Sequence, residues 1–467
     1  MTSDKNNQLP SEPAGTGGSR GNGSRGNGSK SNGDNGVYGL LGHPLGHSYS
    51  KEIHEALGKY SYELFSLDYE NMEAMVRSRE FDGLNVTIPY KQEVIRMCDE
   101  ISPLAASIGA VNTLYHEKDS GRLIGHNTDY EGFLYAADRA GIDFSGKSVL
   151  VLGSGGTSRT VRKALRDRDA GEIYIASRKI QSPAENKIQS PAGNKDKAPI
   201  HITYDELAGK SDTIDIIINT TPVGTFPGNL KRVISLSDFK NCSGVIDVIY
   251  NPFKTALLLE AEKAGIAFSN GLPMLVAQAT AAAGRFLGMP GAFQSENERI
   301  ITKMTKETMN IILVGMPGAG KTTIGRIISK ITGKTFVDMD AEIERETGMT
   351  IPQIFFHKGE PAFRDMEASM AAQLGKKHSL VIATGGGTIL RNENIDALRQ
   401  NGTVIHITRP SENLSTEGRP LSKSREALIQ MRNERMPLYK AASDAEFNNV
   451  YDIETTSKNI ASLLEKL

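Results

Sequence analysis

The chain has 467 residues, which is too long for a single hydrophobic core, so the sequence predicts two or three domains. Hydrophobic residues make up 38% and charged residues 23%, which is typical of water-soluble globular proteins. The net charge is −1, so the composition does not favour nucleic acid or an anionic membrane as a partner. Any anion that the protein binds must therefore be held by a local site.

Neither a targeting segment nor a membrane segment is predicted. No apolar run approaches the length of a bilayer span, and the N-terminus lacks the apolar core of a signal peptide. Cys98 and Cys242 are far apart and have neither disulfide-framework nor metal-ligand spacing. They indicate a reducing compartment, and we expect a cytoplasmic protein.

Two low-complexity stretches are expected to carry no fold. Residues 1–36 are rich in glycine, serine and asparagine and contain SRGNG twice, so they cannot bury enough surface to offset their ordering entropy. The sequence predicts a disordered tail there. A duplication, KIQSPAEN followed by KIQSPAGN at 179–194, predicts an extended surface loop, because closure entropy grows slowly with loop length.

Short Val/Ile runs alternate with longer amphipathic stretches along the rest of the chain. The runs lie at 148–153, 215–220, 244–250 and 310–315. This alternation predicts an α/β fold of strand–helix units around parallel sheets. Residues 291–307 are polar without a strong pattern and separate two segments that each contain a phosphate-binding loop, so we expect a linker there.

The first phosphate-binding loop lies in SVLVLGSGGTSRTVRKAL, residues 148–165, which predicts strand, glycine turn and helix. Gly153, Gly155 and Gly156 would let the backbone approach a pyrophosphate at the helix N-terminus. Position 158 is Ser, so the GxGxxG pattern is incomplete, and a turn that serves packing alone is the alternative.

The following strand, expected over 172–179, bears on the choice of dinucleotide. An NAD-specific fold would place an acidic residue at its end to bind the ribose hydroxyl. This strand ends instead in Ser177, Arg178 and Lys179. Two cations would attract a 2′-phosphate, so the pattern favours NADP; a solvated basic pair is the alternative.

Six polar clusters flank these strands. They are GHPLGHSYSKEIH (42–54), GLNVTIPYK (83–91), GAVNT (109–113), GHNTDYEG (125–132), DVIYNP (247–252) and GLPMLVAQA (271–279). Amides and hydroxyls in this number suit a polyhydroxylated ligand with a carboxylate. Lys91 and Asp129 complete the set; taken singly they would indicate an ordinary surface ion pair.

In this order the six motifs resemble the shikimate dehydrogenase family over residues 37–290. The resemblance implies a substrate-binding domain at 37–136, completed by 271–290, and a Rossmann-like NADP-binding domain at 137–270. Lys91 and Asp129 would form the catalytic pair and contact the substrate. The other implied substrate contacts are Ser48 and Ser50, at the shikimate carboxylate, and Asn85, Thr87, Asn112, Tyr250 and Gln278, at the ring hydroxyls or neighbouring atoms.

The same resemblance implies how a ketone is reduced. NADPH would supply a hydride, Lys91 would stabilise the developing alkoxide and supply a proton, and Asp129 would orient Lys91. The chain departs from the family at Thr157-Ser158-Arg159-Thr160, where small residues ending in Ala are usual, and at 177–179, where Asn-Arg-Thr is usual. The implied cofactor contacts are Gly153, Ser154, Gly155, Gly156, Thr157, Ser177, Arg178, Lys179, Gly271 and Met274.

The second phosphate-binding loop lies in NIILVGMPGAGKTTIGRIISKITG, residues 310–333. It matches GxxxxGK[ST] at Gly315, Gly320, Lys321 and Thr322, between a predicted strand and a predicted helix. Backbone amides would cradle phosphates, Lys321 would reach the β/γ oxygens, and the Thr322 hydroxyl would ligate magnesium. The pattern predicts a P-loop for ATP and Mg²⁺.

Several polar residues after the P-loop indicate a small acidic acceptor. FVDMD (336–340) places Asp338 and Asp340 at the end of a strand, and alternation predicts that both point the same way. One carboxylate would order the water shell of magnesium and the other would accept a proton from a hydroxyl. Arg364 suits a carboxylate clamp. Arg419 and Arg435 follow, for which surface charge on loops is the alternative.

This ordered set resembles the shikimate kinase family over residues 308–467 and implies a P-loop fold like that of nucleoside monophosphate kinases. Asp340, Arg364, Gly386 and Arg435 would bind shikimate, and Asp338 would support magnesium. Arg419, from a short lid, would neutralise the transferring phosphoryl group. Lys321, Asp340 and Arg419 would be catalytic. The implied nucleotide contacts are Gly315, Pro317, Gly318, Ala319, Gly320, Lys321, Thr322, Thr323 and Arg419.

Further details follow from this second resemblance. Phe355 would wall the substrate pocket, and Glu367 would orient Arg364. Only SENLSTEG separates Pro410 from Arg419, and the arginine that usually precedes the lid has no clear counterpart.

The two resemblances imply consecutive steps of aromatic amino acid (chorismate) biosynthesis. The first half would reduce 3-dehydroshikimate to shikimate, and the second would phosphorylate shikimate at the 3-hydroxyl. The expected partners are small molecules, and no oligomeric state is predicted. Quinate in the first half, another hydroxy acid in the second, or a metabolite sensor without turnover are the alternatives. Ser50 favours shikimate over quinate, and the intact catalytic set opposes a sensor.

Overall fold

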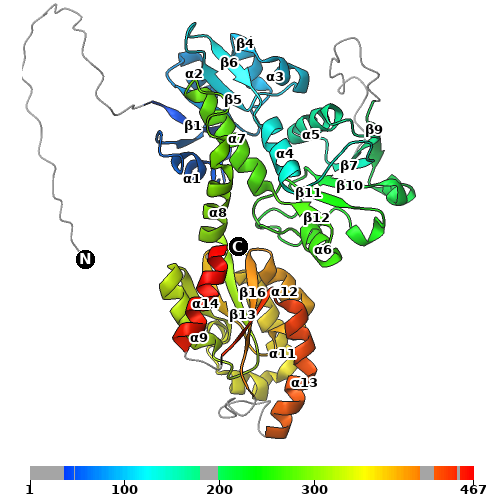
Figure 1. The fold of residues 1–467 in the computed structure, drawn as a ribbon, viewed down its shortest axis with the longest axis vertical. Coiled ribbons are helices and arrows are strands. Elements are labelled where there is room, and N and C mark those ends of the chain that lie inside the picture. The colour runs from blue at the N-terminus through cyan, green and yellow to red at the C-terminus, as the bar shows by residue number, and fades with distance from the viewer. Residues whose placement is uncertain (1–35, 47, 179–197, 411–424, 450–452, 467) are drawn as a thin grey trace, which may run out of the picture. The chain divides into compact units, whose positions relative to one another are not determined.

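The structure, a computed structural model, describes residues 36–46, 48–178, 198–410, 425–449 and 453–466 (Figure 1). The predicted tail, apart from Gly36, and the duplicated loop lie outside the described residues. Residues 36–467 group into one compact unit. Among the described residues, no helix has the length and apolar character needed to cross a membrane.

The first sheet has six strands in the order β2-β1-β3-β5-β6-β4 and is mixed. The strands are β1 (Tyr38–Gly42), β2 (Glu63–Ser66), β3 (Gly83–Val86), β4 (Glu100–Ile101), β5 (Thr113–His116) and β6 (Leu123–His126). β3 and β6 both pair antiparallel with β5, so the prediction of parallel sheets is wrong here. The connection 117–122 is too short to hold the crossover that parallel pairing requires.

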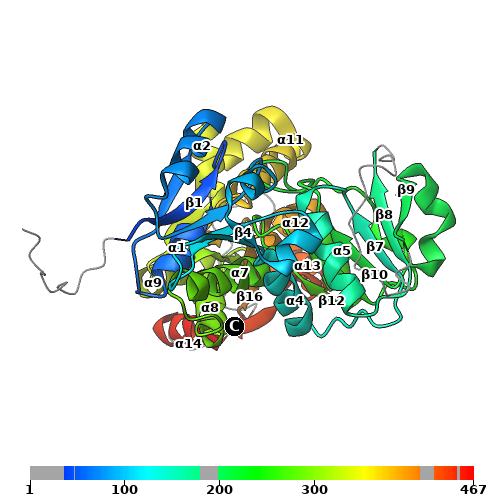
Figure 2. The same cartoon turned by 90° about the horizontal axis from the view of Figure 1, so that it is seen from above.

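Helices cover both faces of the first sheet. They are α1 (Ser50–Glu55), α2 (Tyr69–Ser78) and α3 (Pro103–Ile108). Met72 and Val76 of α2 share a core with Leu41 of β1. Figure 2 shows α2 beside β1. Leu40, which directly precedes Leu41 in β1, belongs instead to the core that contains α1. Successive strand residues thus serve opposite faces.

The second sheet is entirely parallel, in the order β12-β11-β10-β7-β8-β9. Its elements are α4 (Asp129–Arg139), β7 (Val149–Leu152), α5 (Gly156–Asp167), β8 (Ile173–Ser177), β9 (Ile200–Thr203), β10 (Ile216–Asn219), β11 (Gly244–Asp247), α6 (Ala256–Ala264) and β12 (Ala267–Ser269). The strand order reverses between β7 and β10, and ligands bind outside the carboxyl ends of strands at such a point.

Two helices follow the second sheet, α7 (Gly271–Phe286) and α8 (Asn297–Thr308). α8 occupies most of the expected linker, 291–307, a stretch in which no helical pattern was predicted. Ile300, Ile301 and Met304 are buried on one helical face in the core that contains α1 and α7. Polar residues lie between these three apolar positions, so their helical spacing was not recognised in the sequence. The chain therefore enters the third sheet from a packed helix.

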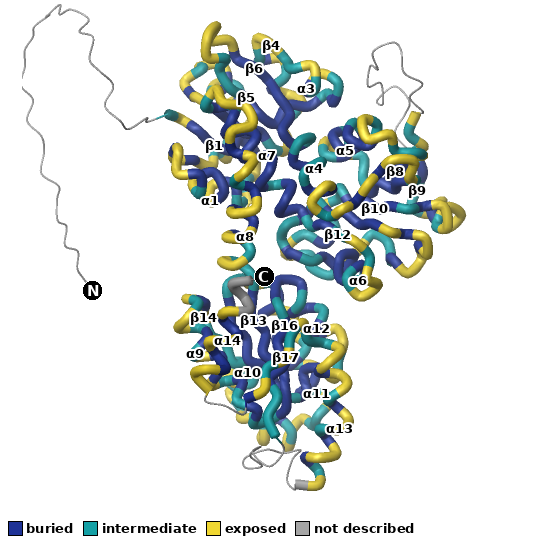
Figure 3. The backbone as a smooth tube through the Cα atoms, in the orientation of Figure 1, coloured by how far each residue is buried: buried dark blue, intermediate teal, exposed yellow. Residues whose placement is uncertain are grey.

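The third sheet is parallel, in the order β14-β15-β13-β16-β17. Its elements are β13 (Asn310–Val314), α9 (Lys321–Thr332), β14 (Thr335–Asp338), α10 (Met339–Thr347), α11 (Ile351–Leu374), β15 (Leu380–Ala383), α12 (Asn392–Arg399), β16 (Gly402–Thr408), α13 (Arg425–Ala442), β17 (Ala445–Asn448) and α14 (Ile453–Lys466). Ile312 and Ile311 lie in separate cores on its two faces. Burial on both faces explains why these central strands are continuous hydrophobic runs (Figure 3).

Local capping explains where several helices begin. Ser102 accepts a hydrogen bond from the backbone of Ala105 ahead of α3, and Thr255 accepts one from Leu258 in α6. Thr350 and Gln353 form a capping box at the start of α11. These N-caps define where the loops end and the helices begin. The polar clusters lie in or beside such loops.

Candidate active sites

A first cavity, of about 210 Å³, opens between the first and second sheets. All nine predicted substrate contacts line it, from six separate stretches of the chain: Ser48, Ser50, Asn85, Thr87, Lys91, Asn112, Asp129, Tyr250 and Gln278. Thr157, Gly271 and Met274, predicted to bind the dinucleotide, line it too. The fold thus brings the predicted substrate contacts next to part of the predicted cofactor site.

An ion pair lies in the wall of this cavity. Lys91 Nζ donates to Asp129 Oδ2 at 2.5 Å, and the side chains are 18% and 12% exposed. Asp129 is the first residue of α4, where the backbone amides favour an anion. A cation fixed in a partly dehydrated wall is suited to stabilising negative charge on a substrate oxygen.

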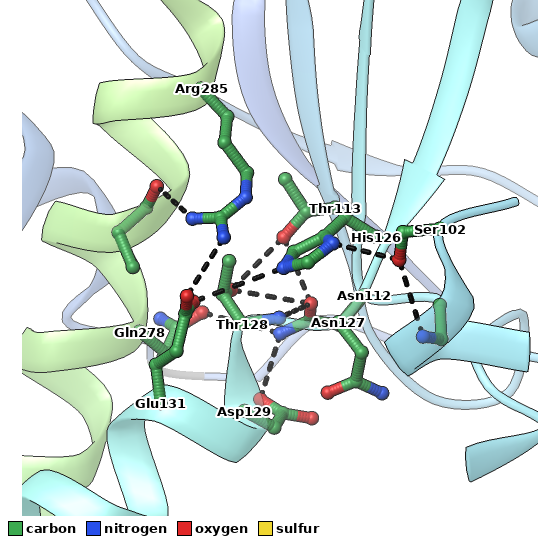
Figure 4. Close-up of polar contacts among 12 residues, drawn as sticks. Ser102, Asn112, Thr113, His126, Asn127, Thr128, Asp129, Glu131, Gln278 and Arg285 are labelled. Carbon is green, nitrogen blue, oxygen red and sulfur yellow. Dashed lines mark hydrogen bonds and ion pairs between the residues drawn. The ribbon is translucent and has the colours of Figure 1, made fainter. Parts of the chain in front are cut away.

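A buried polar network fixes Asp129 from behind (Figure 4). Asn112 Nδ2 donates to Asp129 Oδ1 at 2.8 Å. Asn112 Oδ1 accepts from the backbone N–H of Thr128 at 2.7 Å and from Thr113 Oγ1 at 2.8 Å. The Thr128 hydroxyl, 3.2 Å from Asn112 Oδ1, is a third donor. These donors set the orientation of the carboxamide, so its amino group faces the carboxylate. Sequence reasoning missed Thr113 and Thr128, although both adjoin predicted residues.

A further ion pair, between Arg285 and Glu131, lies beside this network and is drawn in Figure 4. Arg285 of α7 donates to Glu131 of α4 at 2.7 Å. His126 Nδ1 lies 2.8 Å from the Ser102 hydroxyl, and burial, with the charge of Arg285 adding to it, lowers the pKa of His126 to about 3. His126 is therefore neutral at physiological pH. The pair joins α4 to α7, the two helices that carry Asp129 and Gln278.

The other polar side chains of the cavity wall are neutral donors and acceptors. The Ser48 and Ser50 hydroxyls lie 3.0 Å apart. Asn85 Oδ1 accepts from the Tyr62 hydroxyl at 2.8 Å, so its carboxamide is also oriented. Burial raises the pKa of Tyr250, which therefore remains a neutral hydroxyl. Such groups hold hydroxyls and a carboxylate without adding charge.

The predicted dinucleotide loop has the geometry that a pyrophosphate needs. Gly153 has φ +99°, and a Cβ there would lie 3.0 Å from the Thr220 hydroxyl. A Cβ on Gly155 or Gly156 would meet nothing within 4 Å, so the start of α5 faces open space. Ligand phosphates could approach these amides directly, and the residues present fit the cofactor.

The other predicted dinucleotide contacts lie around this loop. Ser177 ends β8 and is buried, and Arg178 is exposed. Lys179 lies outside the described residues. A Cβ on Gly271 would lie 2.1 Å from the Val248 carbonyl oxygen, so α7 can start against the chain after β11 only with glycine there.

A second cavity, of about 560 Å³, lies over the carboxyl ends of the third sheet. The predicted residues that line it are Pro317, Gly318, Gly320, Lys321, Thr322, Thr323, Asp338, Asp340, Phe355, Arg364, Glu367, Gly386 and Arg435. Gly315 and Ala319 do not line it: a Cβ on Gly315 would lie 2.3 Å from the Ile407 carbonyl oxygen, and Ala319 is fully buried. Arg419 lies outside the described residues.

The P-loop holds its lysine and threonine in defined positions. The buried Lys321 Nζ donates to the carbonyl oxygens of Gly315 at 2.8 Å and Met316 at 3.1 Å. Thr322 Oγ1 donates to Asp338 Oδ2 at 2.7 Å. A hydroxyl beside a carboxylate is the oxygen donor set that Mg²⁺ prefers, so these residues fit the metal.

The two aspartates lie on the cavity for a different reason from the one predicted. β14 ends at Asp338, and Asp340 lies in the first turn of α10, so strand alternation does not apply. Asp338 Oδ1 instead caps α10, accepting from the backbone N–H of Asp340 at 3.1 Å. Both aspartates line the cavity, as predicted, but the strand alternation from which this was predicted is wrong.

Asp340 is electrostatically suited to accept a proton. Burial, with the charge of Asp338 adding to it, raises the pKa of Asp340 to about 6. Its buried Oδ1 has no hydrogen-bond partner among the described residues. A carboxylate with a pKa near the working pH is an effective general base.

Two arginines are fixed in the wall of this cavity. Arg364 NH1 donates to Glu367 Oε2 at 2.8 Å, as predicted, and the buried Glu367 accepts from the Thr388 hydroxyl at 2.5 Å. Arg435 lies on α13, only 8% exposed, and NH1 donates to the Gly386 carbonyl oxygen at 2.8 Å. The surface-charge alternative is therefore wrong for Arg435.

Sequence reasoning missed one cation of the second cavity. Arg409 directly follows β16, lines the cavity, and donates from NH1 to the Gly318 carbonyl oxygen at 3.3 Å. No clear counterpart was predicted for the arginine that usually precedes the lid. No local sequence signal marks it, because Arg409 lies beside the P-loop only through the pairing of β16 with β13 in the folded sheet.

Two protein families match this chain. Residues 317–466 match shikimate kinase, and residues 40–114 match the shikimate dehydrogenase substrate binding domain. The NADP(+) shikimate dehydrogenase of Methanococcus vannielii is 38% identical over 253 residues, which are 52% of this chain and 88% of the relative.

Two solved structures extend the likeness to the fold. A chorismate mutase/shikimate 5-dehydrogenase fusion protein from Clostridium acetobutylicum is 34% identical with a TM-score of 0.52, covering 58% of this chain and 97% of the other. Quinate dehydrogenase from Corynebacterium glutamicum, in complex with NAD, is 26% identical with a TM-score of 0.50, covering 57% and 98%.

Proposed function

This chain belongs to the shikimate dehydrogenase family and carries a shikimate kinase domain as well, and from that premise we propose that it catalyses two consecutive reactions. The first is the NADPH-dependent reduction of 3-dehydroshikimate to shikimate. The second is the ATP-dependent phosphorylation of shikimate to shikimate 3-phosphate. The observation that carries the proposal is one polypeptide with two polar cavities, each beside its own phosphate-binding loop.

In the first cavity, Lys91 acts on the ketone oxygen. A bound NADPH supplies the hydride. Lys91 stabilises the negative charge that develops on the oxygen and gives it a proton, which solvent then restores. Asp129 holds Lys91, and Asn112 holds Asp129. Ser48 and Ser50 bind the carboxylate, and the neutral side chains Asn85, Thr87, Tyr250 and Gln278 hold the ring.

In the second cavity, Arg364 and Arg435 bind the shikimate carboxylate, and Asp340 accepts the proton of the attacking hydroxyl. Thr322 and Asp338 would hold magnesium, which lowers the charge repulsion between phosphate and nucleophile. Lys321 keeps a positive charge beside the transferred phosphoryl group. Arg419 completes the proposed catalytic set. We add Arg409 to the proposed nucleotide contacts.

The organisation of the chain is part of the same proposal. A substrate domain at 37–136, completed by 271–290, a dinucleotide domain at 137–270 and a kinase domain at 308–467 would each supply one part of the chemistry. We propose a cytoplasmic location, which agrees with Cys98 and Cys242 both being free.

The test is a product assay on the purified chain. Incubation with 3-dehydroshikimate, NADPH, ATP and Mg²⁺ should consume NADPH and yield shikimate 3-phosphate. Omitting ATP should stop the sequence at shikimate. Quinate with NADP⁺ serves as the specificity control: turnover of quinate comparable to that of shikimate would favour the alternative substrate. No product from either half would refute the proposal.

A further inference from the structure

A short connection in the third-sheet region contacts the outer side of the first cavity. Residues 375–379 join α11 to β15, and His378 Nε2 donates to Asn251 Oδ1 at 3.1 Å. The His378 ring also lies edge-on to the Tyr49 ring, with centroids 6.5 Å apart. Tyr49 in turn lies 5.4 Å from the Tyr250 ring. Both regions belong to the same compact unit.

The two residues that His378 contacts are direct chain neighbours of cavity residues. Asn251 follows Tyr250, and Tyr49 lies between Ser48 and Ser50. Because successive residues share a backbone, a shift of Asn251 or Tyr49 moves a wall of the first cavity. One histidine therefore supports two walls that come from distant parts of the sequence.

Further contacts fix the same loop. The backbone N–H of Phe253 donates to Asn401 Oδ1 at 2.9 Å, and that of Lys254 donates to the Gln400 carbonyl oxygen at 2.8 Å. Asn401 is fully buried and donates to the Gly375 carbonyl oxygen at 2.9 Å, so it belongs to the same corner as His378.

The base of the loop is held within the second sheet. The buried Asp247 accepts hydrogen bonds from Thr255 Oγ1 at 2.7 Å and from the Ile249 backbone N–H at 3.1 Å. Hydrogen bonds from the dehydrogenase region therefore hold the ends of the loop 249–255, and hydrogen bonds from the kinase region hold its middle.

We propose that His378 of the kinase region is a positioning residue for the dehydrogenase, holding Asn251 and Tyr49 so that Tyr250, Ser48 and Ser50 stay in place for the substrate. The inference rests on the proposed function and adds to it that the kinase region supports two walls of the dehydrogenase cavity from behind. His378 precedes β15, whereas the kinase cavity lies at the carboxyl ends of these strands. Its role is therefore separable from phosphorylation.

The test compares variants of the full chain. His378→Ala removes one neutral hydrogen bond and a ring contact, so KM for 3-dehydroshikimate should rise about three- to tenfold. The kcat of reduction should change by less than about twofold, since Lys91 and Asp129 are untouched. Kinase kinetics should be unchanged. His378→Gln keeps an amide donor at the Nε2 position and should restore most of the affinity.

Two further variants sharpen the test. Lys377→Ala, at the exposed neighbouring side chain, should leave both activities unchanged. Asn251→Ala should reproduce the rise in KM, and combining it with His378→Ala should add little, because both remove the same contact.

The outcomes separate this inference from the proposed function. A wild-type chain that does not reduce 3-dehydroshikimate refutes both. A wild-type chain that reduces it, with KM unchanged in His378→Ala, overturns only the positioning role. An equal loss of both activities in His378→Ala and His378→Gln also overturns it, because that pattern indicates a general structural role.

Discussion

We propose that the two cavities of this chain bind the same small acid. The side chains that line them differ in how many are charged. Among the described residues that line the first cavity, Lys91 and Asp129 are the charged ones, and they neutralise each other. Among the residues that the structure describes, eight charged ones line the second cavity: Lys321, Asp338, Asp340, Glu344, Arg364, Glu367, Arg409 and Arg435.

The reactions explain the difference. Hydride transfer to a ketone develops one negative charge on one oxygen, which a single held cation can stabilise. Phosphoryl transfer brings a nucleophile to a polyanion, which requires several cations together with carboxylates that hold a metal and accept a proton. Variants that affect one cavity alone test this comparison, and we take them from the largest expected effect to the smallest.

The largest effect should come from the P-loop lysine. Lys321→Ala should lower kcat of phosphorylation about a thousandfold, because it removes a cation from the transferring phosphoryl group. NADPH oxidation by the same preparation should be unchanged. Lys330→Ala, on the exposed side of α9, is the matched control. Unchanged phosphorylation in Lys321→Ala would remove the P-loop from the mechanism.

Lys91→Ala should have a slightly smaller effect on the other reaction. Reduction of 3-dehydroshikimate should slow about 100- to 1000-fold, because proton donation and charge stabilisation are both lost. Phosphorylation of added shikimate should be unaffected, with the exposed Lys118→Ala as control. Loss of both activities would contradict two separate sites.

Asp340 should give the kinase a pH dependence that the dehydrogenase does not share. With a pKa of about 6 in the free protein, the carboxylate is protonated below pH 6, so kcat/KM for shikimate should fall there and reach a plateau above it. Asp340→Asn should lower the plateau about 100-fold and abolish this limb. A limb that persists in Asp340→Asn would assign the titration to another group.

The same shift in pKa has a consequence for stability. A carboxyl group whose folded pKa is raised destabilises the fold when it is ionised, above pH 6, and has no effect when both states are protonated, below its ordinary value of 3.8. Asp340→Asn should therefore unfold at a higher temperature than the wild type at pH 7.5. The difference should shrink as pH falls toward 4. A thermal melt at the two pH values measures it.

The smallest effect should come from the network behind the first cavity. Thr113→Val keeps the shape of the side chain but removes the donor to Asn112 Oδ1, which leaves the carboxamide less firmly oriented. We expect kcat/KM of reduction to fall about three- to tenfold, with kinase kinetics unchanged. An unchanged kcat/KM would mean that Thr128, through its backbone N–H and its hydroxyl, orients Asn112 without Thr113.

Much of the site was readable from the sequence because phosphate loops are encoded locally. Glycines at positions with positive φ, such as 153 and 320, and residues at fixed offsets, such as Lys321 and Thr322, are specified within a few residues. Hydrophobic runs likewise marked β7, β10, β11 and β13. Each predicted substrate residue belongs to a cluster beside a turn or the end of an element, where local composition is informative.

Other features depended on partners distant in sequence. The antiparallel pairs of the first sheet, the helix α8 and the helical position of Asp340 were all missed or misread. Each depends on which face is buried or which loop an aspartate caps, and a single segment does not contain that information.

By itself, the sequence determined two phosphate loops, an α/β class and most of the side chains on both cavities, because turn and strand chemistry acts over a few residues. The tertiary structure alone decided that six separate stretches form one pocket and that Arg409 joins the second cavity. It also decided that His378 lies behind the first cavity. Such contacts arise when separate elements bury their apolar faces together, and their cause is long-range packing.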